Sequence, residues 1–193
     1  MKSGSLFAED KAVYIADYKL KTKATRATKD SQFWEDLKTG RFAHMVSETS
    51  KGKYIQDSAE AYNILKPMFA EKDDVETFYC IFFNGQNRIL AIEKMFSGSL
   101  TYAAVYPREI IKLVIALKAS AILIAHNHPS GDTNPSAQDK DVTKKIVFSL
   151  TAIDVLLHDH IIVGNGYHSM ADTGLLKSAT DKYQKFFKST RSK

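Results

Sequence analysis

One stretch, residues 121–139, constrains the fold of this 193-residue chain more than any other. A short apolar run within it ends in His126 and His128. If the run is a strand, side chains two residues apart point to the same face, so both imidazoles lie on one side of the sheet. A turn rich in proline and glycine then leads to Ser136 and Asp139, at the start of a predicted helix. The sequence therefore places two imidazoles at a strand end and one carboxylate on the helix that faces it.

The predicted helix after the turn gives Asp139 a buried position. Asn134 can cap this helix and Pro135 suits its first position. An apolar stripe at helical spacing continues from Asp139 through Val142, Ile146, Leu150 and Ile153. Isolated histidines are usually ordinary surface or core residues, but an unpaired carboxylate on a buried face is costly. Two imidazoles, one carboxylate and an open fourth position make a catalytic zinc site, so we predict that His126, His128 and Asp139 bind one Zn²⁺ per chain.

These residues and two further phrases resemble a known family. The His-x-His-x7-Ser-x2-Asp pattern resembles the JAMM motif of JAB (MPN-plus) metalloproteases, and the surrounding sequence resembles the RadC-type branch. The phrases that carry the resemblance are Val105-Tyr-Pro-Arg-Glu-Ile110, Ile124-Ala-His-Asn-His-Pro-Ser-Gly131 and His158-Asp-His-Ile-Ile-Val-Gly164. The resemblance covers roughly residues 75–176. It implies a JAB/MPN-like (cytidine-deaminase-like) α/β fold, with a central mixed β-sheet flanked by helices, and a zinc peptidase or isopeptidase activity.

The order of expected elements also favours an α/β layer fold. They are a strand at 12–21, a short helix at 30–37, a helix from the capping residue Asp57 through Met68, a hairpin of 77–83 and 88–95, a strand at 100–105, a helix at 107–119, the histidine strand and its helix, and a closing strand pair at 160–163 and 167–170. We divide the chain into an N-terminal extension with a basic segment (1–56), a JAB/MPN metallohydrolase domain (57–176) and a basic C-terminal tail (177–193). The helix-hairpin-helix region of longer family members is not recognisable, so a short form is expected.

The resemblance further implies a general base and an oxyanion helper. In the family, a glutamate at the entrance of the first hairpin strand moves the proton from water to the leaving amine, and Val75-Glu76-Thr77-Phe78 matches that entrance, which assigns Glu76. Glu109 is the alternative base, although an acid in the first turn of a helix is also explained by the helix dipole. Ser136 matches the family's serine that stabilises the tetrahedral oxygen, and it is equally explained as a capping residue.

Two other residue types bear on the site and the compartment. His158 and His160 stand two apart at the start of another strand, so one of them can contact the site without being a metal ligand. The single cysteine, Cys80, excludes an internal disulfide, suits a reducing cytosol and lies in an apolar run typical of a buried strand. No apolar run approaches a membrane span and the first residues lack a signal-peptide core, so a cytoplasmic protein without a membrane partner is expected.

The net charge of +5 is concentrated at the two ends. Residues 19–29 contain five basic residues and no acid, and residues 177–193 contain six basic residues and one acid. Such segments either attract nucleic acid through its phosphates or are solvated, partly disordered extensions. Two function classes follow. One is a zinc metallohydrolase with a peptide or protein substrate, and the other is a DNA-repair-associated RadC-like factor, a nuclease or accessory protein without peptidase activity.

Overall fold

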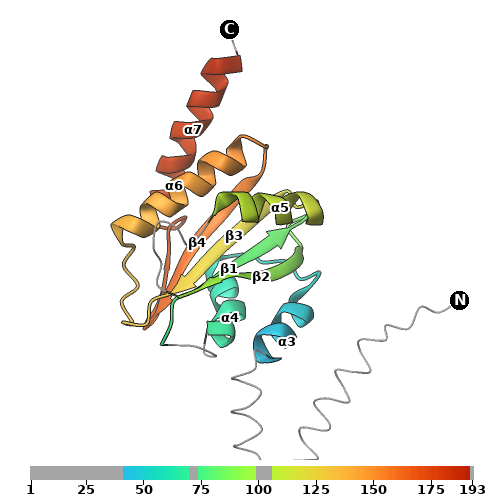
Figure 1. Ribbon diagram of the computed structural model, residues 1–193, viewed down its shortest axis with the longest axis vertical. Coiled ribbons are helices and arrows are strands. Elements are labelled where there is room, and N and C mark those ends of the chain that lie inside the picture. The colour runs from blue at the N-terminus through green and yellow to red at the C-terminus, as the bar shows by residue number, and fades with distance from the viewer. Residues whose placement is uncertain (1–40, 70–73, 99–105, 192–193) are drawn as a thin grey trace, which may run out of the picture. The chain divides into compact units, whose positions relative to one another are not determined.

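Two largely apolar strands, buried along their whole length, lie at the centre of the fold. The computed structural model (Figure 1) describes residues 41–69, 74–98 and 106–191. The elements predicted at 12–21, 30–37 and 100–105 lie outside the described residues. The five-stranded sheet has the order β2-β1-β3-β4-β5. Its strands are β1 (Thr77–Phe83), β2 (Ile89–Ser97), β3 (Ala121–Asn127), β4 (Leu156–Gly164) and β5 (Gly166–Ser169).

The sheet is mixed because one of its pairings is parallel. β1 pairs antiparallel with β2 and β3, and β4 pairs antiparallel with β5. β3 and β4 are parallel, and such a pair needs a long crossover connection. The helix α6 (Ala137–Thr151) lies in that connection. The predicted mixed α/β fold is thus confirmed, and the crossover places the start of α6 close to the end of β3.

Helices cover both faces of the sheet (Figure 1). The helix α4 (Ser58–Phe69) packs on one face, together with α3 (Arg41–Ser50). The helix α5 (Pro107–Leu117) and α6 pack on the other. Alternate side chains of β1 and β3 enter the two cores, which is why both strands read as continuous apolar runs. The even-numbered residues of β3, His126 among them, point to the α5 and α6 face.

The start of α6 differs from the prediction. Its N-cap is Ser136, not Asn134: the Ser136 hydroxyl accepts the Asp139 backbone N–H, and the Asp139 carboxylate accepts the Ser136 N–H. This reciprocal capping box satisfies two helix-end donors, whereas the Asn134 amide donates to Asp132 in the preceding turn. The helix ends at Thr151, so Ile153 lies beyond the buried stripe and is 39% exposed.

The C-terminal segment is helical. The helix α7 (Leu175–Arg191) covers most of residues 177–193, the basic segment at the C-terminal end of the sequence. Leu176 is buried in a small core with Val147, Ile162 and Met170, and Ala179 and Tyr183 pack against that core. These three α7 residues are spaced three and four apart, so they form one helical stripe that the high basic charge obscured in the sequence. Among the described helices, none has both the length and the apolar character needed to cross a membrane.

Candidate metal centre

The three predicted ligands lie together at the junction of β3 and α6. The Nε2 atoms of His126 and His128 are 2.9 Å apart. His126 Nε2 is 3.1 Å from one Asp139 carboxylate oxygen, and His128 Nε2 is 3.4 Å from the other. His126 is fully buried, Asp139 is 4% exposed and the His128 side chain is 13% exposed. Within the part of the chain that the structure describes, this is the group of His, Cys and acidic side chains that could hold a metal ion.

Local structure orients each ligand before any metal binds. The capping box holds the Asp139 carboxylate against the Ser136 N–H at 2.7 Å, which leaves its outer lone pairs directed at the imidazoles. The His128 Nδ1 atom lies 2.7 Å from the backbone carbonyl oxygen of Asp132. A carbonyl can only accept, so His128 Nδ1 carries a proton, and the neutral form of His128 presents the lone pair of its Nε2 to the site. Gly131, at φ 80, closes the turn between the strand and this contact.

The geometry and donor set fit zinc. Four ligands at about 2.0–2.1 Å from Zn²⁺ in a tetrahedron are about 3.3 Å from one another. The separations of 2.9, 3.1 and 3.4 Å among the two nitrogens and the carboxylate oxygens are close to that edge length. Nitrogen and carboxylate oxygen are both good zinc donors. The three side chains can therefore hold one Zn²⁺ with a fourth position open.

The electrostatics of the site favour a positive charge beside Asp139. Burial by itself would raise the pKa of Asp139, but the close imidazoles of His126 and His128 and the hydrogen bond from Ser136 lower it well below its usual value. The hydrogen bond to Asp139 raises the pKa of His128, although burial opposes the shift, and the charge of Glu76 adds to the rise. Protonated His128 and a bound metal ion would each interact with the Asp139 carboxylate, so protonation of His128 and metal binding compete.

The predicted general base, Glu76, lies directly before β1. β1 and β3 pair Phe78 with His126, so two more residues along each strand set Glu76 opposite His128. The half-buried Glu76 is close enough for its charge to affect the pKa of His128. The backbone on both sides of Glu76 is bonded to one buried side chain: Asn127 accepts the Thr77 N–H at 2.7 Å and donates to the Val75 carbonyl at 3.1 Å.

Sequence reasoning missed Asn127. Its position between the two histidines puts its side chain on the opposite face of β3 from theirs, which is readable from strand periodicity. Its partners are about fifty residues earlier in the chain, and only the pairing of β3 with β1 brings them into reach.

The alternative base, Glu109, has a different environment. Its carboxylate bonds Lys112 at 3.0 Å and Arg108 at 3.1 Å, both within α5, and these hydrogen bonds, led by that from Lys112, lower its pKa. An acid paired in this way in a first helical turn stabilises the helix end.

The Ser136 hydroxyl caps the helix α6 as an acceptor and can still donate its own hydrogen. Its oxygen accepts the Asp139 N–H at 3.1 Å, and the residue is exposed. A hydroxyl that accepts one bond still has its own O–H to donate, so capping does not prevent contact with a substrate oxygen.

His158 and His160, two residues apart, point to opposite faces of the sheet. β4 carries one more residue than β3 between the pairs Ile122–Leu157 and Ile124–His160. This bulge turns His160 toward His126, with His126 Nδ1 and His160 Nε2 2.9 Å apart. His158 instead packs edge-on against Phe83 and bonds the Asn87 side chain on the α4 face. The alternation of side chains along a regular strand would put the two histidines on the same face. The bulge in β4 cannot be recognised from that alternation.

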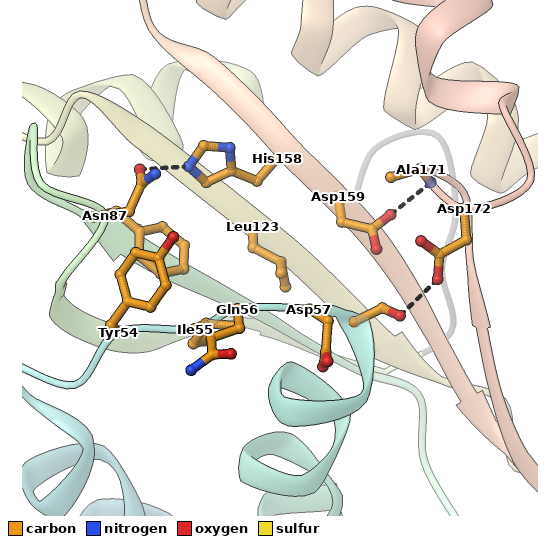
Figure 2. Close-up of a pocket in the computed structure, with 12 residues that line it drawn as sticks. Tyr54, Ile55, Gln56, Asp57, Asn87, Leu123, His158, Asp159, Ala171 and Asp172 are labelled. Atoms are coloured by element: carbon orange, nitrogen blue, oxygen red, sulfur yellow. Dashed lines mark hydrogen bonds between the residues drawn. The ribbon is translucent and has the colours of Figure 1, made fainter.

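A separate pocket of about 250 Å³ lies on that α4 face (Figure 2). Leu123, His158 and Asp159 contribute to it from β3 and β4, and Asp57 and Asp172 lie at its edge. Burial raises the pKa of Asp159, although the carboxylate accepts hydrogen bonds from the Ser169 hydroxyl at 2.6 Å and the Ala171 N–H at 2.8 Å. These contacts join β4 to the end of β5 and to the segment that follows it. The sheet separates this pocket from the metal centre.

The fold and the site together define an α/β domain of the JAB type with a candidate metal centre at the end of its central strand. Residues 55–175 match the family model of the RadC-like JAB domain. Because this match covers more than half of the chain, the protein belongs to the RadC-like JAB domain family.

Similar proteins carry the name UPF0758. One from Thiobacillus denitrificans is 38% identical over 133 residues, which are 68% of this chain and 59% of that protein. UPF0758 protein YfjY of Escherichia coli is 43% identical over 102 residues, 52% of this chain and 64% of the relative. UPF0758 protein Reut_A2732 of Cupriavidus pinatubonensis is 44% identical over 106 residues, 54% of this chain and 46% of the relative. The chain thus covers less than two thirds of the length of each relative.

Proposed function

We propose that the protein is a zinc-dependent hydrolase of peptide or isopeptide bonds, acting on a peptide or protein substrate in the cytoplasm. The observation that carries the proposal is the convergence of His126, His128 and Asp139 on one space: one potential ligand atom from each lies within 4.8 Å of the others, and the two Nε2 atoms are 2.9 Å apart. Such a group is stabilised by a cation and by little else. A bound Zn²⁺ would lower the pKa of water toward about 7 and polarise the carbonyl oxygen of an amide.

The chain's own residues supply the proton transfers and the stabilisation of charge. In this proposal Glu76, opposite His128, takes a proton from the attacking water and delivers it to the leaving amine nitrogen. Ser136 in turn donates its O–H to the oxygen that becomes negative in the tetrahedral intermediate. Asn127 keeps the Glu76 backbone in position through its two hydrogen bonds.

Metal analysis of purified protein tests the site. We expect about one zinc per chain, and loss of zinc in His126→Ala and Asp139→Ala. His44→Ala is the matched control, because His44 lies exposed on α3 and should leave the zinc content unchanged. Wild-type protein that takes up no zinc from a zinc-containing buffer would refute the proposed metal centre.

Cleavage of a peptide library tests the chemistry. Glu76→Gln should retain zinc and lose hydrolysis, by about 10²–10⁴-fold as for a lost general base. Glu109→Gln, which removes the alternative base, should retain hydrolysis. The reverse result for the two variants would transfer the role of base to Glu109.

A second candidate function is that of a DNA-repair-associated RadC-like factor, a nuclease or accessory protein. The exposed lysines Lys177, Lys182 and Lys185 on α7 favour it, since basic side chains on one helix can neutralise phosphates. DNA binding that persists after zinc removal, without cleavage of any peptide, would support this function over the first.

A further inference from the structure

A chain of buried hydrogen bonds joins two of the candidate ligands behind the metal centre. His126 Nδ1 lies 2.9 Å from His160 Nε2, and His160 Nδ1 lies 2.6 Å from the Thr143 hydroxyl oxygen. That hydroxyl lies 2.6 Å from the backbone carbonyl of Asp139. The chain therefore runs from a ligand on β3, through β4, to the backbone of a ligand on α6.

We propose that His160 and Thr143 are positioning residues that hold His126 in the single tautomer able to bind the metal. This inference rests on the proposed function in one respect, namely that His126 is a metal ligand. It adds two residues that have no place in the ligand set or in the proposed proton transfers.

The donor and acceptor of each of these hydrogen bonds follow from the last group in the series, the Asp139 backbone carbonyl. The Asp139 carbonyl can only accept, so the Thr143 hydroxyl donates to it. The Thr143 oxygen then accepts from His160, which must carry its proton on Nδ1. Neutral His160 therefore has a lone pair on Nε2 and accepts from His126 Nδ1–H. His126 is left with a lone pair on Nε2, the atom that faces His128 and Asp139.

Burial prevents water from replacing these partners. His126 and His160 are fully buried, and Thr143 is 3% exposed. The Phe78 ring stacks on His126 and meets His160 edge-on, which closes the side of the chain toward β1. The Met170 sulfur, 3.5 Å from the Thr143 hydroxyl, is a weaker and more distant acceptor than the carbonyl at 2.6 Å, so it does not redirect the proton.

The same contacts also couple two elements mechanically. The Asp139 carboxylate points at the metal centre, while its backbone carbonyl receives the Thr143 hydroxyl. Because Thr143 also meets His160 on β4, the chain holds the first turn of α6 against the sheet. Loss of the hydroxyl should therefore weaken metal binding without removing any ligand.

Nitrogen NMR on the intact wild-type protein tests the tautomers directly. We expect long-range ¹H–¹⁵N spectra to show His160 protonated on Nδ1 and unprotonated on Nε2, with a proton on His126 Nδ1, in both zinc-free and zinc-loaded protein. His160 protonated on Nε2 would overturn the inference. This readout needs no activity, and it tests the chain even if zinc does not bind.

Zinc affinity of three threonine variants tests the consequence. Thr143→Val keeps the shape and removes the hydroxyl, and its zinc dissociation constant, measured by chelator competition, should rise about 10–100-fold. Thr143→Ser restores the hydroxyl and should stay within about threefold of wild type. Thr151→Val is the matched control, because it removes the same kind of hydroxyl-to-carbonyl bond, at 2.7 Å, from the far end of α6.

The outcomes separate the two proposals. Wild-type protein that binds no zinc refutes the proposed function. The tautomers seen by NMR then still test whether the hydrogen bonds from His126 to Asp139 have the proposed directions. Wild-type protein that binds zinc, with Thr143→Val and Thr151→Val both equal to it, refutes the role of Thr143 and His160 while the proposed function stands. Weak binding in Thr143→Val, rescued in Thr143→Ser, supports both.

Discussion

The substitution Asn127→Ala should destabilise the protein while leaving its metal ligands intact. Asn127 is only 5% exposed, and its side chain makes two hydrogen bonds. It accepts one from the Thr77 N–H and donates one to the Val75 carbonyl. A buried intramolecular hydrogen bond contributes about 1 kcal/mol net, and a group left without a partner costs about 1–3 kcal/mol. We therefore expect a loss of about 2 kcal/mol in the free energy of unfolding.

Urea denaturation of zinc-free protein, followed by circular dichroism, measures this loss. For a domain of this size, about 2 kcal/mol corresponds to a fall of about 4–8 °C in Tm. Asn63→Ala is the matched control, because Asn63 is exposed on α4 and its substitution should change stability by no more than about 0.5 kcal/mol. The zinc dissociation constant of Asn127→Ala should equal that of wild type. A stability loss no larger than that of Asn63→Ala would refute the reasoning that Asn127 holds the Glu76 segment.

Three further predictions concern the site's proton, the thiol and the turn. The pKa of His128 is raised from 6.5, and at pH values below the raised pKa its proton competes with the metal. Zinc affinity, measured by calorimetric titration, should therefore rise as the pH increases through a value above 6.5. A zinc affinity that does not change with pH would contradict this. Burial raises the pKa of Cys80, so a disulfide reagent should label it in urea but not in native protein, and rapid native labelling would show that the thiol is accessible. In Gly164→Ala the new Cβ would lie 2.5 Å from the Gly131 carbonyl oxygen, which should cost about 1–3 kcal/mol of unfolding free energy by urea denaturation. Gly85→Ala, whose Cβ meets nothing within 4 Å, is its control, and equal stability of the two variants would count against the close approach.

Several local features could be predicted from the sequence because each depends on neighbours in the chain. The hairpin strand Thr77–Phe83 has the predicted bounds, since an apolar run and a turn of Asn84 to Asn87 specify it locally. Asp57 caps α4 by accepting the Glu60 N–H, as its spacing from Glu60 predicts. The spacing of His126 and His128 and the helical phase of Asp139 also depend only on nearby residues.

Other features depend on which strands become neighbours. The bulge in β4 separates the faces of His158 and His160, and it exists only in the pairing of β4 with β3. Asn127 finds its partners through the pairing of β3 with β1. The capping of α6 by Ser136 in place of Asn134 is instead local, because the box joins Ser136 and Asp139 three residues apart and could have been read from that spacing.

From the sequence alone, the spacing along one strand and one helix indicated the residue types of the candidate metal centre, the order of elements indicated the α/β class, and the resemblance of three phrases indicated the family. The tertiary structure decided which residues support that centre. His160, Thr143 and Asn127 reach it from segments that only the sheet and its parallel crossover bring together. The pairing of segments that are distant in the sequence leaves no periodic pattern of residues within either segment. These supporting contacts could therefore be identified only in the folded structure.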